Sequence, residues 1–176
     1  TQLVVCLLFQ YAGMSFVDFA HLKERNIKNG ILDYNRQKTG TPMRLEILDT
    51  AELMRKELMG DKKPASGYLF PFLSGTKTGY EAYLEYNAAL SRFNRNLKAL
   101  KKAAGIASDV TSYTIRHSFA MALKEQNVPI EMISELLGHK SIKTTQIYLR
   151  SFSLEKMTEV NSTCFGCVYN YVSKVG

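Results

Sequence analysis

The chain has 176 residues, of which 45% are hydrophobic and 22% are charged, and its formal net charge is +7. This length and composition are ordinary for one soluble globular domain with a sizeable core. No apolar run reaches the roughly 18 residues of a membrane span, and the run at 3–9 lacks the flanks of a signal peptide. The positive charge is compatible with nucleic acid, a membrane surface or an acidic protein, and by itself it does not choose among them.

The cysteines indicate a reducing environment. Cys6, Cys164 and Cys167 are an odd number of thiols in a basic chain without a secretion signal, which favours reduced cysteines in a cytoplasm. Cys164 and Cys167 have the spacing of a metal or redox pair. No second Cys or His pair stands nearby, so two small apolar side chains in a tail are the simpler interpretation. Because Thr1 begins inside an apolar pattern without a helix start signal, we expect a cut point in a longer protein.

The first part of the sequence predicts two helices and a small antiparallel sheet. A mostly buried helix is expected over 2–12, where Gly13 breaks it, and Ser15 with Asp18 forms a possible capping box for a short helix through about Leu22. Three strands are expected at 24–28, 31–36 and 43–48.

Two turns join these strands. Asn29-Gly30 is a strong signal for a two-residue hairpin turn. Lys38-Thr39-Gly40 forms the second turn and places Lys38 at the tip of a hairpin. The segment therefore predicts a three-stranded meander.

The rest of the chain predicts helices. They are expected from Asp49 or Thr50 to about Met59, over 81–104, from Thr111 or Ser112 to about Gln126, from Pro129 to Gly138, from Ser141 to about Tyr148, and over 153–160. Residues 60–79 read as a loop, and no assignment is made for the tail. The predicted fold class is α+β, mainly α-helical, with a small three-stranded antiparallel sheet.

The helix at 81–104 carries two stripes. Apolar residues recur at helical spacing at Leu90, Phe93, Leu97, Leu100 and Ala104. The other side carries the basic residues Arg92, Arg95, Lys98 and Lys102. A solvated face and a surface that binds DNA phosphates explain this basic stripe equally well.

The sequence also contains the residue types that a metal-free phosphodiester-cleaving site needs, namely Arg116, His139, Tyr148 and Lys38. Arginine suits the negative charge of the transition state because its planar fork stays protonated and donates two hydrogen bonds. A histidine just after a helix end adds a donor from a fixed position. A tyrosine hydroxyl can attack phosphorus, and a lysine on a hairpin can protonate the leaving sugar oxygen. No cluster of Asp, Glu or His with metal-ligand spacing is visible, so neither a metal ion nor a cofactor is expected.

Each of these residues also has a simpler structural explanation. Tyr148 is one of ten tyrosines and could be packed at a helix end, Arg116 could be a salt-bridge partner, and His139 could cap a helix. Lys38 is a typical exposed turn residue, and His117 reads most simply as a satisfied histidine in the core or behind the site residues. The combination in sequence order, and no single member, favours a catalytic set.

The sequence resembles the tyrosine recombinase, or phage integrase, family over about residues 5–160. The downstream motif is the most specific and consists of Tyr113–Ala120, Leu136–His139 and Thr144–Tyr148. Upstream, Gly13–Asp18 is similar to the family's first motif and Gln37–Gly40 to its lysine hairpin. The amino-acid sequence of these motifs is most similar to that of integrases of conjugative transposons and related mobile elements.

The resemblance implies a role for each matching residue. Tyr148 would be the nucleophile that forms a 3′-phosphotyrosine and releases a 5′-hydroxyl. Arg116 would bind the scissile phosphate and His139 would donate to it. Lys38 would be the general acid toward the leaving 5′-oxygen. The 5′-hydroxyl of a second strand would then attack the phosphotyrosine without ATP.

The sequence departs from the family pattern at two positions. Ser15 stands where the first motif usually has a catalytic arginine, and Tyr113 stands where a histidine usually precedes Arg116. Ser15, Tyr113 and His117 are therefore expected at the margin of the site. The missing cation could be supplied by Arg36, Arg44 or Lys23, and the sequence does not choose among them.

The resemblance also implies an organisation. Residues 1–161 would be the catalytic domain and 162–176 a tail, with a separate DNA-clamping domain upstream. The expected partners are double-stranded DNA, three further copies of the chain in a tetramer on paired sites, and accessory directionality or host architectural proteins, all in the cytoplasm and without a membrane.

Three alternatives stay open. One is the same chemistry used as in type IB topoisomerases or telomere resolvases. Another is a DNA-binding protein whose catalysis has decayed, motivated by the missing arginine. The third is a helical module that binds no nucleic acid.

Overall fold

The predicted fold class is confirmed by a computed structural model, which describes residues 1–61, 67–149 and 157–158 and omits the side chain of Tyr148. The helices are α1 (Gln2–Gln10), α2 (Phe16–His21), α3 (Asp49–Met59), α4 (Gly79–Ala103), α5 (Ser112–Glu125), α6 (Ile130–Leu136) and α7 (Ile142–Tyr148). The strands are β1 (Ile27–Lys28), β2 (Ile31–Asn35) and β3 (Pro42–Glu46), preceded by the 3-10 turn η1 (Glu24–Asn26). In these ranges, no helix is long and apolar enough to cross a membrane.

The sheet is an antiparallel meander in the order β1-β2-β3. Asn29 and Gly30 form the first turn with positive φ angles of 51° and 75°, as the Asn-Gly pair predicts. Alternate residues of β2 face the core, so Leu32 and Tyr34 are buried and pair with Leu45 and Met43 of β3.

Several element ends differ from the predictions. The strand expected at 24–28 is reduced to Ile27–Lys28, because the Asn26 side chain accepts a hydrogen bond from the Lys23 amide at 2.8 Å and holds a 3-10 turn there. Helix α3 already begins at Asp49 and follows Leu48, which gives no side-chain cap. Pro129 precedes α6 instead of being its first residue.

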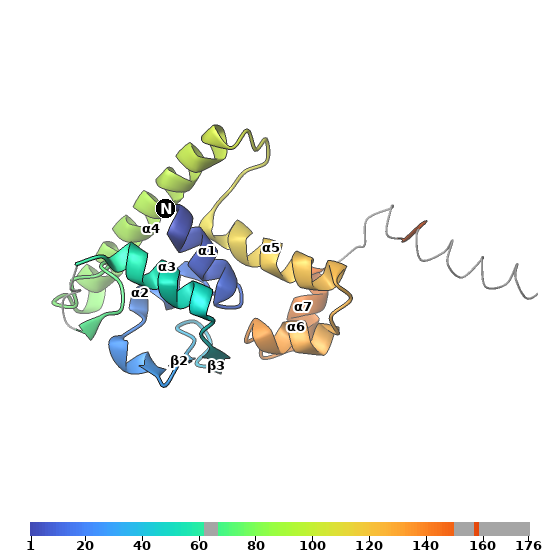
Figure 1. Ribbon diagram of the computed structural model, residues 1–176, viewed down its shortest axis with the longest axis horizontal. Helices are drawn as coiled ribbons and strands as arrows, with labels where there is room; N and C mark the ends of the chain where they lie inside the picture. Colours follow the sequence, from blue (N-terminus) through green and yellow to red (C-terminus); the bar gives the residue numbers. More distant parts are fainter. Residues whose placement is uncertain (62–66, 150–156, 159–176) are drawn as a thin grey trace, which may run out of the picture.

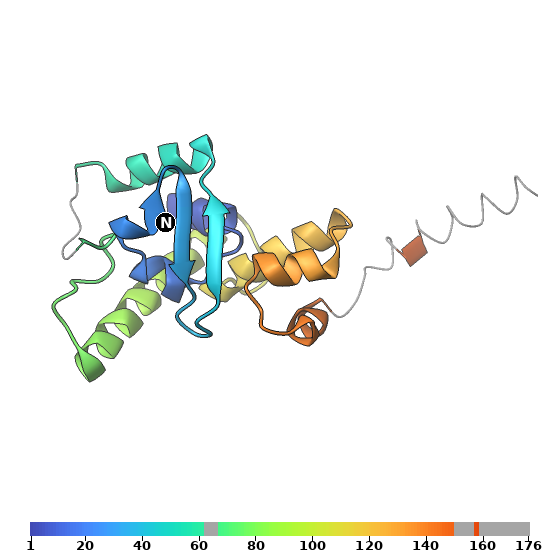
Figure 2. The same ribbon diagram turned by 90° about the horizontal axis from the view of Figure 1, so that it is seen from below.

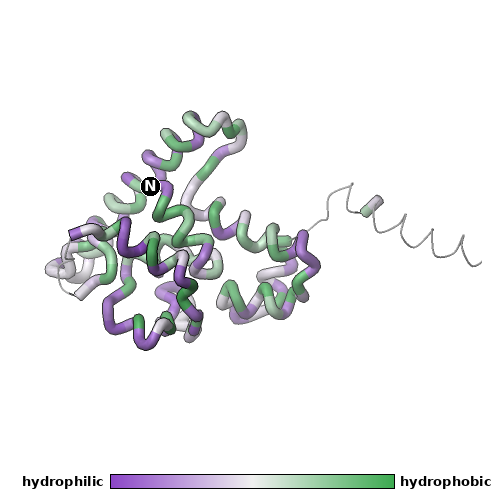
Figure 3. Tube along the Cα trace, viewed as in Figure 1, coloured by the Kyte–Doolittle hydropathy of each residue, from purple (hydrophilic) through white to green (hydrophobic). Residues whose placement is uncertain are grey.

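The main core lies around α1, which runs through the middle of the molecule and is mostly hydrophobic (Figures 1 and 3). Leu7 and Leu8 of α1 are fully buried, and helices α3 and α5 pack on α1. The aromatic rings of Phe19 and Phe70 stack at 4.1 Å, and Phe16 stacks on Phe93 of α4 at 4.6 Å. These contacts fix α2 against α4 and against the segment that carries Phe70.

A smaller core joins α5 and α6 to the end of α7. Its buried members are Ala120, Ile133, Leu137 and Leu149. Seen from below, the turn between β2 and β3 points between α4 and the α6–α7 pair (Figure 2). Segments far apart in the sequence therefore meet at this turn.

Helix α4 separates its two predicted stripes. Phe93 and Leu97 are buried, but Ala104 at the predicted end of the apolar stripe is exposed and lies just beyond the helix, which ends at Ala103. The basic stripe, consisting of Arg92, Arg95, Lys98 and Lys102, is exposed throughout.

Two predictions fall largely or wholly beyond the described residues. Of the helix expected at 153–160, residues 157 and 158 are described, and both are helical. Cys164 and Cys167 lie outside the described residues, whereas Cys6 is an exposed free thiol.

Candidate active site

Three of the four predicted catalytic residues line one open cavity of about 510 Å³. Arg116 comes from α5, His139 follows α6, and Lys38 comes from the β2–β3 turn. Helix α7 also contributes to the wall through Thr144 and ends at Tyr148, whose side chain lies outside the described part of the chain. The cavity therefore gathers the segments that the sequence singled out.

Arg116 is buried against backbone carbonyls, with 4% of its surface exposed. It donates hydrogen bonds to the carbonyl oxygen of Gly13 at 2.9 Å and to that of Leu137. Leu137 caps the C-terminal end of α6, where carbonyls lack partners within the helix and carry partial negative charge. These contacts explain how a cation is held in a buried position before any substrate arrives.

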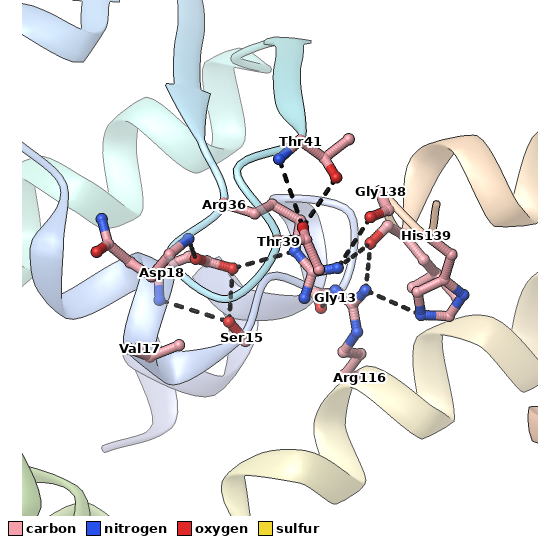
Figure 4. A network of polar contacts seen from close by, with 12 residues as sticks. Gly13, Ser15, Val17, Asp18, Arg36, Thr39, Thr41, Arg116, Gly138 and His139 are labelled. Atoms are coloured by element: carbon pink, nitrogen blue, oxygen red, sulfur yellow. Dashed lines mark hydrogen bonds and ion pairs between the residues drawn. The ribbon is translucent and has the colours of Figure 1, made fainter. Parts of the chain in front are cut away.

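Arg36 is a second guanidinium at the same place (Figure 4). Its Nη1 donates to the carbonyl oxygens of Leu137 at 2.9 Å and of Gly138 at 3.1 Å. Arg36 and Arg116 thus share the Leu137 oxygen as acceptor, and both line the cavity.

The buried carboxylate of Asp18 connects the first motif to the lysine hairpin. Its Oδ2 accepts from Ser15 Oγ at 2.6 Å and from Arg36 Nε at 3.4 Å, and its Oδ1 accepts from the Gln37 amide at 2.7 Å. Ser15 is the N-cap of α2, and its Oγ accepts from the Asp18 amide, which confirms the capping residue. The Asp18 carboxylate bonds to the Ser15 hydroxyl, which differs from the reciprocal backbone bond of the predicted capping box. The base of the turn that carries Lys38 is therefore tied to α2.

The predicted margin residues separate into two groups. Ser15 and Tyr113 line the cavity, and Tyr113 is exposed. His117 is also exposed and does not line the cavity, so the interpretation as a core histidine is wrong. Its position follows from α5, because Ile115 and Arg116 already occupy the buried side of that turn.

The basic stripe of α4 does not reach the cavity. Arg92 lines a separate groove with Phe72 and Phe93, and Arg95, Lys98 and Lys102 are exposed outside the cavity wall. The part of α4 that reaches the cavity is formed by Tyr86 and Leu90.

His139 is anchored in a neutral form. Its Nδ1 lies 2.8 Å from Oγ1 of the fully buried Thr145 of α7, and its Nε2 lies 3.5 Å from Nη2 of Arg116. Because a guanidinium only donates, Nε2 accepts and the proton sits on Nδ1, facing Thr145. Burial, followed by the positive charges of Arg116 and Arg36, lowers the pKa of His139 to about 4.

Gly138 allows α6 and the sheet to meet at the site. Its φ is +60°, and an added Cβ would lie 2.5 Å from Met43 Sδ and 2.7 Å from Arg36 Cδ. We expect Gly138→Ala to lower the free energy of unfolding by about 1–3 kcal/mol, through backbone strain and overpacking. Urea unfolding of this variant and of Gly105→Ala checks this, because Gly105 has a similar φ of +66° and open space around it. Equal losses in the two variants would contradict the predicted clash.

Comparison with known proteins gives a consistent assignment. The model of the phage integrase family matches residues 1–155. The tyrosine recombinase XerD of Lacticaseibacillus casei is 52% identical over 54 residues, which is 31% of this chain and 18% of XerD. The tyrosine recombinase XerC of Rickettsia typhi is 41% identical over 75 residues, which is 43% of this chain and 24% of XerC.

Solved structures share the fold at low identity. XerA recombinase superposes with a TM-score of 0.65 at 22% identity, covering 89% of this chain and 55% of XerA. The Tn1549 transposon integrase in complex with a circular intermediate DNA gives a TM-score of 0.64 at 16% identity, covering 91% of this chain and 57% of the integrase. The chain thus spans about half the length of these two proteins. Since the family model matches nearly all of the chain and the fold agrees, the chain belongs to the phage integrase family of tyrosine recombinases.

Proposed function

We propose that this chain is the catalytic domain of a site-specific DNA recombinase that cuts and rejoins DNA through a 3′-phosphotyrosine. The observation that carries the proposal is the single cavity lined by Lys38, Arg116 and His139, with a wall that includes the helix ending at Tyr148. Membership in the tyrosine recombinase family supports the same reaction.

In the proposed first step, the Tyr148 hydroxyl oxygen bonds to phosphorus and the bond from phosphorus to the 5′-oxygen breaks. Lys38 gives its proton to that oxygen, and the phenol releases its own proton to solvent. The neutral lysine then takes up a proton from solvent, so no net proton is lost. Arg116 binds the non-bridging oxygens. In the second step the 5′-hydroxyl of another strand attacks the phosphotyrosine, so the number of phosphodiester bonds is conserved.

The position of Lys38 suits a general acid. Its side chain is exposed at the turn, while the turn itself is closed by hydrogen bonds between the backbones of Arg36 and Thr41 at 2.9 Å and of Gly40 and Arg36 at 2.8 Å. A long exposed side chain on a hydrogen-bonded turn can reach the leaving oxygen without moving the phosphate-binding groups.

His139 must change its hydrogen bonding to serve the phosphate. In the DNA-free protein its Nε2 accepts, so donation from Nε2 requires either a gained proton or the other tautomer. A phosphate anion beside the ring favours the charged form, so DNA binding should raise the pKa of His139 and take up protons.

The lowered pKa of His139 predicts a pH dependence of stability. Unfolded histidine titrates near 6.5 and the folded residue near 4, so the unfolded chain binds more protons between these values. The neutral histidine therefore stabilises the fold above about pH 6.5, and this contribution is lost as the pH falls toward 4. Urea unfolding at pH 7 and pH 4.5 should show a larger loss for the wild type than for His139→Gln. Equal losses would contradict the neutral assignment.

Double-stranded DNA is the proposed substrate and partner. The net charge of +7 supports it, and the solved Tn1549 integrase relative is a DNA complex. We further propose that Arg92, Arg95, Lys98 and Lys102 contact phosphates outside the cavity. A homotetramer on paired sites, accessory directionality or architectural proteins, and a separate clamping domain beside residues 1–161 are proposed from the family alone.

Covalent trapping tests the proposed function. The recombination site is first selected from randomised duplexes by binding to the full-length Tyr148→Phe protein, and is then made as a nicked substrate whose cleaved end diffuses away. The wild type should accumulate a protein–DNA adduct. The same selected site tests the alternative of decayed catalysis, because a decayed DNA-binding protein would bind it without forming an adduct.

A further inference from the structure

We propose that Arg36 binds the scissile phosphate beside Arg116, in place of the arginine that the family's first motif carries where this chain has Ser15. The inference rests on the proposed recombinase function and deepens it by naming a further phosphate-binding residue. It answers a chemical requirement, since two guanidinium groups stabilise the growing charge on a phosphodiester better than one.

The first support is the position of the two guanidinium groups. Arg36 and Arg116 reach the same acceptor, the carbonyl oxygen of Leu137, although one directly follows β2 and the other lies in α5. Arg36 is 8% exposed and lines the cavity that also contains His139 and Lys38. A phosphate that contacts Arg116 in this cavity would therefore lie beside Arg36.

The second support is the unused donor of Arg36. Its Nε is bonded to Asp18, and its Nη1 is bonded to the carbonyls of Leu137 and Gly138. Among the described residues, the other terminal nitrogen, Nη2, has no hydrogen-bond acceptor. The guanidinium is thus held in place by three bonds while one nitrogen stays available for a phosphate oxygen.

The third support is the carboxylate that links position 15 to position 36. Asp18 is 2% exposed and accepts from both Ser15 Oγ and Arg36 Nε through the same oxygen. Ser15 is short enough to cap α2 and bind Asp18 from the cavity wall, while Arg36 supplies the charge. Asp18 also holds the Gln37 amide, so the cation and the Lys38 turn are positioned together.

The two other basic residues that the sequence offered lie elsewhere. Arg44 is exposed on β3 opposite Asp33 and lines a separate groove with Met132. Lys23 lies over the Tyr68 ring at 5.3 Å and lines another groove. Neither residue lines the cavity of Arg116 and His139.

The test compares cleavage of two nicked substrates by the full-length protein. One has the normal scissile phosphate, and the other has a methylphosphonate there, which removes the charge of one non-bridging oxygen. We expect Arg36→Ala to slow single-turnover adduct formation about 10²–10³-fold on the phosphate. On the methylphosphonate, the ratio of the wild-type rate to the Arg36→Ala rate should be at least about tenfold smaller. The reason is that the transition state then carries less negative charge for Arg36 to stabilise. Arg44→Ala, the matched control, should stay within about threefold of wild type on both substrates.

A second variant covers the case in which Arg36→Ala fails to fold because Asp18 loses its buried partner. Arg36→Lys keeps a cation next to Asp18 but loses the planar fork, and should show a smaller deficit with the same dependence on substrate. Wild-type rates for folded Arg36 variants, or an equal deficit on both substrates, would overturn the inference while leaving the proposed function intact. No adduct from the wild type on the normal phosphate would overturn the proposed function and this inference together.

Discussion

Replacing Tyr148 by phenylalanine is expected to abolish the covalent protein–DNA adduct and leave DNA binding nearly unchanged. The substitution removes one oxygen atom, and phenylalanine has no group that can attack phosphorus. Loss of a nucleophile in a well-studied hydrolase costs about 10⁶-fold in kcat, and a comparable loss here would place the adduct below detection. Denaturing gels of the trapped complex measure the adduct, and gel shifts measure binding.

The matched control for this prediction is Tyr80→Phe. Tyr80 is 73% exposed on α4 and does not line the cavity, so the same loss of a hydroxyl should leave adduct formation within about threefold of wild type. A Tyr148→Phe protein that still forms the adduct at the wild-type rate would remove Tyr148 from the mechanism.

Replacing Arg116 is the second change with a large expected effect. Arg116→Lys should slow single-turnover cleavage about 10²–10³-fold, because one ammonium group cannot make the hydrogen bonds of the guanidinium fork. Arg116→Ala should also lower the free energy of unfolding by about 1–3 kcal/mol, since the buried carbonyls of Gly13 and Leu137 lose a donor. Adduct formation in reactions quenched at fixed times measures the cleavage rate, and urea unfolding measures the loss of stability.

The control on the same helix is Ser118→Ala. Ser118 is exposed and does not line the cavity, so both cleavage and stability should stay close to wild type. If Arg116→Lys cleaved at the wild-type rate while binding DNA normally, the phosphate-binding role of Arg116 would be wrong.

Local sequence signals predicted most elements of this fold. The Asn29-Gly30 turn, the capping of α2 by Ser15 and the positive-φ glycine after the C-cap of α6 all depend on nearby residues, and the structure confirms each. The errors are at element ends. At β1, for example, a side-chain hydrogen bond of Asn26 replaces strand pairing.

The assembly of the site could be predicted only in part. Order along the chain identified Lys38, Arg116 and His139 as a set, and the structure brings all three to one cavity. Their shared environment depends on contacts between distant segments, such as the bond from Arg36 to Leu137, 101 positions apart. No local pattern encodes such a contact, and the side chain of Tyr148 lies outside the described residues.

A signal for Arg36 was nevertheless present in the sequence. Leu32, Tyr34 and Arg36 alternate along β2 and its end, and all three are buried. Because side chains alternate between the two faces of a strand, the two-residue spacing places Arg36 on the same inward face as Leu32 and Tyr34. An inward-facing arginine two positions before the hairpin lysine therefore indicates a buried cation. The same alternation places Arg44 of β3 on the outer face of the sheet, opposite Asp33.

The structure also changes how the predicted histidine is understood. His139 was expected as a donor to phosphate, but its site-facing nitrogen accepts from Arg116 and its proton faces Thr145. The tautomer depends on buried neighbours in α5 and α7, which spacing along the chain does not reveal. Under the proposed mechanism, an anion that binds at Nε2 would therefore change the protonation of His139.

Tyr148, among the ten tyrosines of the chain, is the residue proposed to become linked to DNA. Mass spectrometry of the trapped adduct after trypsin tests this directly, since cleavage after Lys143 and Arg150 yields residues 144–150 with one tyrosine. We predict that the 3′-phosphate of the cleaved strand is found on Tyr148 in this peptide. A linkage to any other residue, or no linkage from a protein that binds the selected site, would contradict the account.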